Sequence, residues 1–148
     1  MEMTCIQVTE IGGFRLARLP VQAPGDDEVL VKVTVAGVCR TDLKLIRVGH
    51  RDLVLPRIPG EEVVGAIAAK GAKVAGLECG DRGYLYPGQW CGQCPSCRCG
   101  AENLCSAMRI MGFHRDGGFA QYVTVPAQSV IPLPDDLPAE AAVFAEPL

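Results

Sequence analysis

The densest group of reactive side chains is a run of five cysteines in fifteen positions, CGQCPSCRCGAENLC, which starts at Cys91. Four of them, Cys91, Cys94, Cys97 and Cys105, follow the pattern C-x2-C-x2-C-x7-C. Closely spaced CxxC turns present neighbouring sulfurs to one tetrahedral ion. Cys99 follows Cys97 by only two residues, so the backbone would have to fold back sharply for both to bind the ion. The spacing predicts a structural zinc site that leaves Cys99 free.

Two other interpretations of the cysteines stay open. An iron–sulfur cluster uses the same thiolate ligands, and spacing alone does not distinguish iron from zinc. Unligated thiols fit less well with so dense and ordered a group. Disulfides are typical of exported proteins, but the start MEMTCIQVTE has neither the basic residues nor the apolar stretch of a secretory signal. The sequence therefore favours a reducing, cytoplasmic setting.

Composition limits the size and the partners of the protein. With 148 residues, 49% of them hydrophobic, the chain can bury one core, so we expect a single domain over residues 1–148. The formal net charge is −3, and no basic run with interleaved aromatic residues indicates nucleic-acid binding. The longest apolar run, VVGAIAAK, is too short to span a bilayer. We expect neither a nucleic acid nor a membrane as partner.

Most of the chain reads as short strands. In EVLVKVTVAGV, residues 28–38, valines alternate with other side chains at period two, as in a half-buried strand. Similar runs begin at Phe14, Glu62, Asp81 and Gly117, each ended by glycine or proline. This pattern predicts a mainly β fold, either a sandwich or a partly open barrel.

Helices and connections are scarcer. The segment TDLKLIR can form two helical turns with Thr41 near the cap, and Pro138 can occupy the first turn of a helix through AEAAVFAEPL. The proline-rich VIPLPDDLP, residues 130–138, reads as an extended connection. The cysteines form a lobe inserted as a long loop over roughly residues 88–108.

The order of motifs resembles one family. GVCRTDL, PGEEVVG, GDRG, the four-cysteine lobe, GGFAQYVTVP and AEPL together are similar to the N-terminal, GroES-like catalytic domain of zinc-dependent medium-chain alcohol and polyol dehydrogenases. The resemblance covers nearly the whole chain. It implies a GroES-like, partly open barrel and oxidation of an alcohol, diol, polyol or sugar by hydride transfer to NAD⁺ or NADP⁺. It also implies a homodimeric or homotetrameric parent protein.

The resemblance assigns roles around the start of GVCRTDL. Cys39 would be a ligand of a catalytic zinc, and Thr41 would pass the proton of the alcohol outward. Asp42 would orient a ligand or a loop, Arg40 would approach the pyrophosphate of the cofactor, and Lys44 occupies the place of a relay histidine.

Each of these residues also has a purely structural interpretation. Arg40 and Lys44 can be solvated helix charges, Thr41 a cap, and Asp42 a first-turn acid that favours the helix dipole. For Lys44 this interpretation is the stronger one.

One departure from the family affects the metal ligands. Where relatives read GHE, this chain has Gly60, Glu61 and Glu62, so a carboxylate replaces the usual imidazole. By resemblance to polyol dehydrogenases, Glu146 of AEPL would be the third ligand beside Cys39 and Glu61, with Glu62 in the same catalytic site. A rival set uses Glu62 in place of Glu61. One thiolate and two carboxylates would give Zn²⁺ a net negative site and make it a weaker Lewis acid.

The only two imidazoles could replace the missing ligand. His50 lies in a polar stretch, RVGHRD, and His114 precedes a glycine pair in GFHRDGG. A lone loop histidine is more often solvated than bound to metal, so we disfavour both.

The other departure is an absence. No G-x-G-x-x-G motif follows a strand, and the chain stops at Leu148, where relatives would begin their Rossmann half. We therefore expect a fragment of a longer parent, inactive alone because it lacks the dinucleotide site. The competing class is a noncatalytic zinc-binding or interaction module whose catalytic site has decayed, and the number of metal ions per chain would separate the two.

Overall fold

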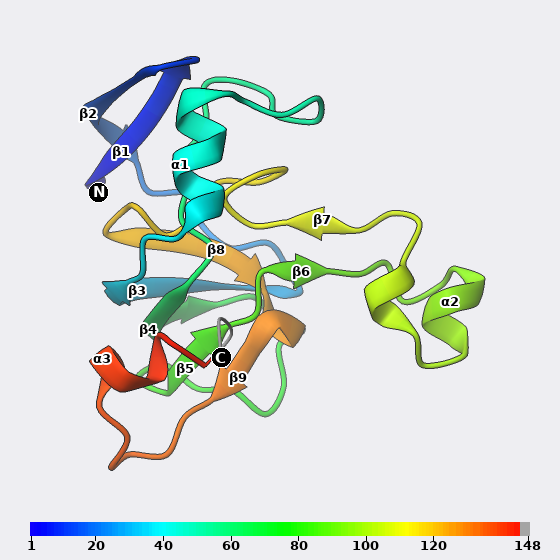
Figure 1. Cartoon of the computed structure of the whole chain (residues 1–148). Coiled ribbons are helices and arrows are strands. Elements are labelled where there is room, and N and C mark those ends of the chain that lie inside the picture. The colour runs from blue at the N-terminus through cyan, green and yellow to red at the C-terminus, as the bar shows by residue number, and fades with distance from the viewer. Residues whose placement is uncertain (146–148) are drawn as a thin grey trace.

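Strands make up most of the regular structure of residues 1–145, the part of the chain that the computed structural model describes (Figure 1). The strands are β1 Glu2–Glu10, β2 Gly13–Pro20, β3 Glu28–Ala36, β4 Val63–Lys70, β5 Arg82–Leu85, β6 Gly88–Gln89, β7 Arg109–Ile110, β8 Tyr122–Pro126 and β9 Val130–Pro132. The helices are α1 Arg40–Arg47, α2 Pro95–Arg98 and α3 Ala139–Ala142. The predicted mainly β class with few short helices is confirmed.

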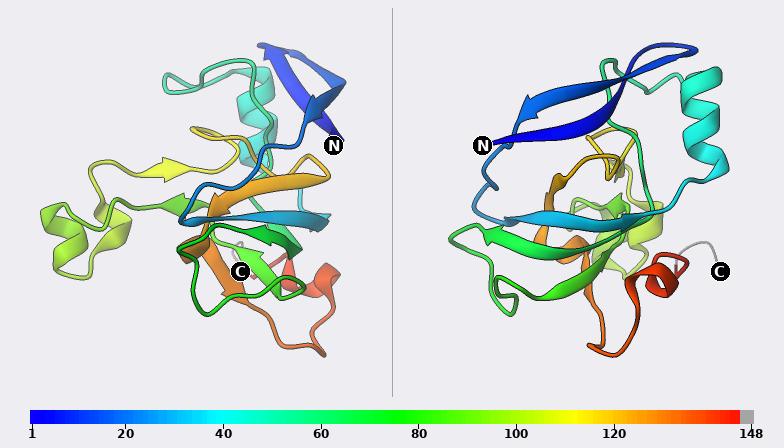
Figure 2. Two further views of the ribbon diagram at one scale, coloured as in Figure 1. Left: turned by 180° about the vertical axis from the view of Figure 1, so that it is seen from behind. Right: turned by 90° about the vertical axis from the view of Figure 1, so that its left-hand side faces the viewer.

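The largest sheet has five antiparallel strands in the order β8-β3-β4-β5-β9. Its central pairing, β3 with β4, shifts register between Leu30 and Val31 and again between Val33 and Val35. Such irregularities bend a strand and increase its twist. The sheet curls into a half-barrel, as Figure 2 shows, so the partly open barrel is confirmed and the sandwich is not.

Both faces of the sheet are covered near β4. Val63 and Ile67 belong to the main core together with Val29 and Val31 of β3. Val64 points to the other face, where it joins a second cluster with Tyr84 and the residues of α3. The helix α3 therefore packs against the outside of the half-barrel, which explains why two successive valines of β4 are both buried.

The N-terminal hairpin lies over the half-barrel, beside α1 (Figure 2). The outer strand of the hairpin, β2, includes the strand predicted to begin at Phe14, whereas β1 was not predicted. β1 lies between β2 and the rest of the chain: the Ile6 N–H donates to Phe119 O at 2.8 Å, and Val8 exchanges two backbone hydrogen bonds with Arg57. The hairpin thus fixes the position of the segment around Arg57.

Two details of the C-terminal region correct the sequence interpretation. Pro138 is the residue before α3 and has an extended backbone, φ −60° and ψ 139°, so it caps the helix from outside. The helix makes one turn and ends at Ala142, and residues 146–148 lie outside the described residues. Val130–Pro132, predicted as part of a connection, pairs with β5 as strand β9.

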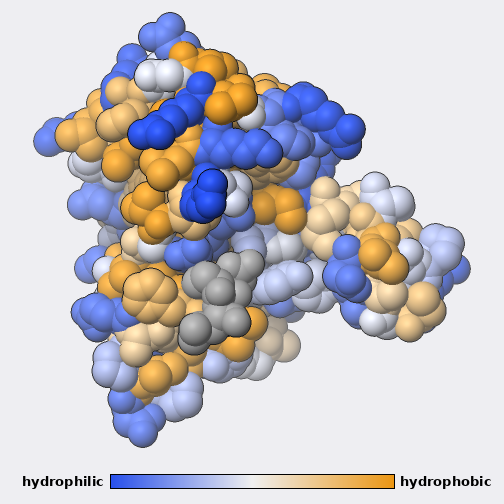
Figure 3. All heavy atoms as spheres, viewed as in Figure 1, coloured by the Kyte–Doolittle hydropathy of each residue, from blue (hydrophilic) through white to orange (hydrophobic). Residues whose placement is uncertain are grey.

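The cysteine-rich segment projects away from the half-barrel as a separate lobe, which is also visible in the space-filling view (Figures 1 and 3). Antiparallel pairing of β6 with β7 closes its base. The segment between these two strands contains α2 and a short 3₁₀ turn, Glu102–Leu104.

No helix within residues 1–145 has the length and the apolar content needed to cross a membrane.

Candidate metal and catalytic site

Four cysteines of the lobe converge on one point. The Sγ atoms of Cys91, Cys94, Cys97 and Cys105 all lie within 4.8 Å of one another, and those of Cys94 and Cys97 are 3.4 Å apart. Tetrahedral Zn–S bonds of about 2.3 Å place sulfurs about 3.8 Å apart, so the group has the dimensions of a zinc-binding cluster. The Cys99 thiol donates to Ser96 O at 3.2 Å instead and does not join the group.

Backbone N–H groups near the cluster stabilise negative charge on its sulfurs, which favours binding of a cation. The N–H groups of Cys91 and Ala107 donate to Cys105 Sγ at 3.3 and 3.4 Å. The backbone N–H of Cys97 holds the pKa of the Cys94 thiol down at about 6, while burial raises the pKa of Cys97 to about 12. A metal ion that binds the cluster would displace the protons that remain on these thiols.

Cys39 lies at the junction of β3 and α1, where it is the residue that caps the helix. Burial raises the pKa of its thiol, and hydrogen bonds from the Asp42 backbone N–H and from the Thr41 side chain oppose this shift only in part. A thiol of raised pKa becomes a thiolate at neutral pH when a cation binds to it. The setting of Cys39 fits a metal ligand.

Asp42 joins two segments that are distant in sequence. Its carboxylate is fully buried; Oδ2 accepts the Cys39 N–H at 2.9 Å and Oδ1 accepts the Gly60 N–H at 3.0 Å. One side chain thus fastens the start of α1 to the residue that precedes Glu61. The arrangement holds the backbones of two predicted ligands at a fixed separation.

Gly60 and Gly37 are required by close packing, Gly60 against Phe119 and Gly37 against Glu62. Gly60 has φ +102°, and a Cβ there would lie 2.7 Å from the ring of Phe119, so other residues fit poorly. Glu62 is buried, and its backbone oxygen accepts the Gly37 N–H at 2.9 Å. A Cβ at Gly37 would overlap the carboxylate oxygen Oε2 of Glu62. The Glu62 side chain therefore lies against the loop two residues before Cys39.

The predicted catalytic ligands do not gather as tightly as the lobe cysteines. Within residues 1–145, the lobe supplies the only group of three or more Cys, His, Asp or Glu side chains whose ligand atoms lie within 4.8 Å of one another. Cys39, Glu61 and Glu62 do not form such a group, and the third predicted ligand, Glu146, lies outside the described residues.

The remaining predicted residues lie on α1 and are exposed. Arg40, Thr41 and Lys44 face solvent, with Lys44 one turn after Arg40. The Thr41 side chain is hydrogen-bonded to the Cys39 thiol, which places a hydroxyl next to the predicted ligand. The roles of Arg40 and Lys44 toward a cofactor and a proton stay predictions.

Both histidines serve local structure. Their rings pack on Phe113, with centroids 4.6 Å away for His50 and 4.7 Å away for His114. Each Nδ1 accepts a backbone N–H, from Asp52 at 3.2 Å and from Ile110 at 2.9 Å. Burial lowers the pKa of His114, which favours the neutral ring. Neither belongs to a group of three ligands in the described part of the chain.

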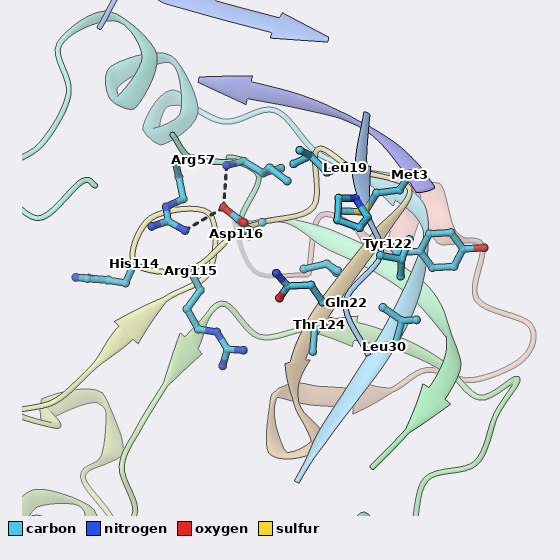
Figure 4. A pocket seen from close by; sticks show the side chains of 15 residues that line it. Met3, Leu19, Gln22, Leu30, Arg57, His114, Arg115, Asp116, Tyr122 and Thr124 are labelled. Atoms are coloured by element: carbon cyan, nitrogen blue, oxygen red, sulfur yellow. Dashed lines mark hydrogen bonds and ion pairs between the residues drawn. The ribbon is translucent and has the colours of Figure 1, made fainter. Parts of the chain in front are cut away.

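A cavity of about 490 Å³ lies between the end of β2 and strand β8 (Figure 4). Its apolar walls are formed by Met3, Leu19, Leu30, Ile58 and Val123. None of the residues predicted for chemistry lines it. The cavity is therefore distinct from the candidate catalytic site, although Arg57 and Asp116 at its edge contact the segment that leads to Glu61.

Sequence reasoning missed Gly37, which gives room to Glu62, and Asp116, which binds the backbone before Glu61. The glycine pair in HRDGGF was a usable signal, because adjacent glycines often mark a close approach of two backbones. The sequence did not indicate which segment the two glycines approach.

Comparisons with known proteins agree with this geometry. Residues 25–135 match the alcohol dehydrogenase GroES-like domain. The chain is 42% identical to alcohol dehydrogenase 2 of Emericella nidulans over 136 residues, or 86% of the chain and 37% of that protein. It is 38% identical to D-altritol 5-dehydrogenase of Agrobacterium fabrum over 146 residues, or 99% of the chain and 43% of that protein.

A solved structure shows the same arrangement. The crystal structure of an Escherichia coli alcohol dehydrogenase complexed with NADH superimposes with a TM-score of 0.92 at 32% identity and covers 99% of this chain. The chain corresponds to 42% of that structure, so it spans about two fifths of the length of the proteins it matches.

Proposed function

Because the chain belongs to the alcohol dehydrogenase GroES-like domain family, we propose that it is the catalytic-domain part of a zinc-dependent dehydrogenase. The parent would oxidise an alcohol, diol, polyol or sugar by hydride transfer to NAD⁺ or NADP⁺. The observation that supports this most directly is the Asp42 carboxylate, which holds Cys39 and the residue before Glu61 together from inside the fold.

Different residues of the chain would bind the metal, transfer the alcohol proton and bind the cofactor. A zinc ion held by Cys39, Glu146 and one of the two glutamates would supply electrophilic polarisation of the alcohol oxygen. The exposed hydroxyl of Thr41, beside the Cys39 thiol, would accept the alcohol proton and pass it to solvent. Arg40 would attract the cofactor pyrophosphate from the first turn of α1, and Lys44 would either relay the proton or remain a solvated charge.

The wider assignments belong to the same proposal. A Rossmann half after Leu148 would bind the nucleotide, and the parent would be a cytoplasmic homodimer or homotetramer. Glu146 would favour a diol, polyol or sugar over a simple alcohol, and the similarity to D-altritol 5-dehydrogenase supports this substrate class. We propose that the catalytic domain spans residues 1–148 and that the zinc lobe within it spans about residues 88–108.

The number of bound metal ions tests the function. We expect two Zn²⁺ per chain, one in the lobe and one at Cys39. Glu62→Gln should remove the second ion and spare the first if Glu62 is a ligand, whereas Glu61→Gln should do so if Glu61 is. The measurement is elemental analysis of the purified variants, with the lobe zinc as internal reference.

A different count would support the competing function. One Zn²⁺ per wild-type chain would indicate a noncatalytic zinc-binding module, which the absence of the family's histidine at Glu61 and the looser grouping around Cys39 favour. If both glutamine variants keep two ions, neither glutamate is an essential ligand. His50 would then become the candidate for the missing ligand.

We also expect residues 1–148 to bind neither NAD⁺ nor NADP⁺ measurably. Arg40 alone can offer one charge-assisted contact to a pyrophosphate that would otherwise stay in water. Isothermal titration calorimetry with each dinucleotide checks this, and the intact parent is the positive control. A micromolar dissociation constant for the chain would contradict the expectation and would reveal a nucleotide site within it.

A further inference from the structure

We propose that Asp116 is a positioning residue for the segment that carries Glu61 and Glu62, and that it acts through the backbone amide of Ile58. The inference rests on the proposed function, because it assumes that one of these glutamates binds the second metal ion. The effect of Asp116 is on the path of the backbone that leads to the two glutamates.

The contacts of Asp116 are drawn in Figure 4. Its Oδ1 accepts the Ile58 N–H at 3.0 Å and also the Arg57 guanidinium, with Nη1 at 2.9 Å. Asp116 therefore binds the side chain of Arg57 and the backbone of the next residue, Ile58. Both belong to the segment that leads into Gly60.

The residues after Asp116 continue this contact along the same segment. The Gly117 N–H donates to Ile58 O at 2.7 Å, the Gly118 N–H to Gly60 O at 2.9 Å and the Phe119 N–H to Pro59 O at 3.0 Å. A Cβ at Gly117 would overlap Gly60 O, and one at Gly118 would overlap the side chain of Val63. The two backbones are thus in direct contact, and Asp116 begins the run.

Every backbone polar group of residues 58–60 has a partner in this arrangement. Asp116 accepts the Ile58 N–H, Asp42 accepts the Gly60 N–H, and Pro59 has no N–H to donate. The three carbonyl oxygens accept the three N–H groups of residues 117–119. Two carboxylates, one at each end, therefore complete the hydrogen bonding of the segment immediately before Glu61.

The two carboxylates differ in burial, and this decides which one can be tested without loss of the fold. Asp42 is 0% exposed, whereas the Asp116 side chain is 54% exposed at the edge of the cavity. The two groups that Asp116 would leave behind, the Arg57 guanidinium and the Ile58 N–H, belong to residues that line this cavity. Its removal should loosen the segment while the half-barrel and the lobe remain folded.

The test is a Zn²⁺ or Co²⁺ titration of residues 1–148 that follows the second ion separately from the lobe ion. Asp116→Ala should weaken the second site about 10- to 100-fold, as loss of a residue that orients a ligand does, and leave the lobe affinity unchanged. Asp116→Asn keeps the oxygen that accepts the Ile58 N–H, so it should bind within about fivefold of wild type, because an exposed ion pair contributes little. Amide hydrogen exchange at Ile58 should accelerate in the alanine variant alone.

Two controls make the result specific. Arg57→Gln removes the ion pair but not the bond to Ile58, and should resemble Asp116→Asn. Asp136→Ala removes an exposed aspartate from the connection before α3 and should have no effect on either ion. If Asp116→Ala does not melt cooperatively, Asp116→Glu, which displaces the carboxylate by one methylene, should weaken the second site in the same direction.

Three outcomes would overturn the inference. Wild-type affinity of the second site in Asp116→Ala would show that the segment holds its position without the aspartate. Equal damage in Arg57→Gln would assign the effect to the ion pair instead of the Ile58 amide. A wild-type chain that binds zinc only in the lobe would overturn the proposed function and this positioning role with it, a result distinct from the other two because it appears before any substitution.

Discussion

Cys97→Ser is expected to release the zinc of the lobe, whereas Cys99→Ser should retain it. Cys97 is one of the four thiols that converge within 4.8 Å, whereas the Cys99 thiol donates to Ser96 O outside this group, so the ion would keep only three thiolate ligands in Cys97→Ser. A serine hydroxyl has a shorter bond to carbon and is a far weaker ligand than a thiolate. Because structural zinc contributes about 10–16 kcal/mol of apparent binding free energy in small zinc-dependent folds, the segment between β6 and β7 should lose its order.

The comparison of the two variants also locates the free thiol. Elemental analysis should give one zinc fewer per chain for Cys97→Ser and no change for Cys99→Ser. Thiol titration with Ellman's reagent should show new reactive cysteines only in the first variant. Loss of zinc in Cys99→Ser, with retention in Cys97→Ser, would reverse the assignment.

The lobe could be predicted from the sequence because its geometry is local. Cys94 caps the short helix α2 and Cys97 lies within it, so three residues of chain bring these sulfurs together. Cys105 returns after one further turn, and β6 pairs with β7 at the base. Spacing along the chain therefore translates almost directly into distance between ligands.

Five of the nine strands, β2, β3, β4, β5 and β8, could also be predicted from the sequence. β6 and β7 have only two residues each, and the other two exceptions, β1 and β9, also have physical reasons. In β1 the burial pattern is irregular, since Gln7 and Val8 are both buried between β2 and the segments around Arg57 and Phe119. Period-two alternation fails where a strand has neighbours on several sides. β9 ends at Pro132, and the prolines of residues 130–138 resembled a linker although Tyr84 and Leu85 pair with β9. A three-residue strand gives too short a pattern to recognise.

The catalytic region could be predicted only in part because it depends on distant contacts. Cys39, Glu61 and Glu62 were identified through the resemblance of their motifs. That Asp42 would reach Gly60, and that Asp116 would reach Ile58, required the folded chain, since these pairs are 18 and 58 residues apart. The sequence indicates which side chains can do chemistry, while the three-dimensional path of the backbone decides which acids hold them in place.

Asp42→Asn is expected to cost about 3 kcal/mol of the free energy of unfolding and to weaken metal binding at Cys39. The substitution keeps the shape of the side chain but replaces one of its two oxygens with an amino group. Asp42 uses Oδ1 for Gly60 and Oδ2 for Cys39, so in the variant one of these N–H groups would face another donor. A buried donor left without an acceptor costs about 1–3 kcal/mol, and the loss of a charge-assisted bond adds to this.

Thermal unfolding measures the effect, with an expected decrease in Tm of roughly 6–12 °C for a chain of this size. Asp81→Asn is a matched control, because the exposed Asp81 accepts one backbone N–H, from Glu78 at 2.7 Å, through a single oxygen that asparagine also provides. Its Tm should change by less than about 3 °C. The burial of Asp42 makes solvation by water an inadequate substitute, and therefore a wild-type Tm in Asp42→Asn would mean that the two segments it joins are held by other contacts. In that case zinc binding at Cys39 should be unaffected as well, since the same two hydrogen bonds fix the separation of Cys39 from the residue before Glu61.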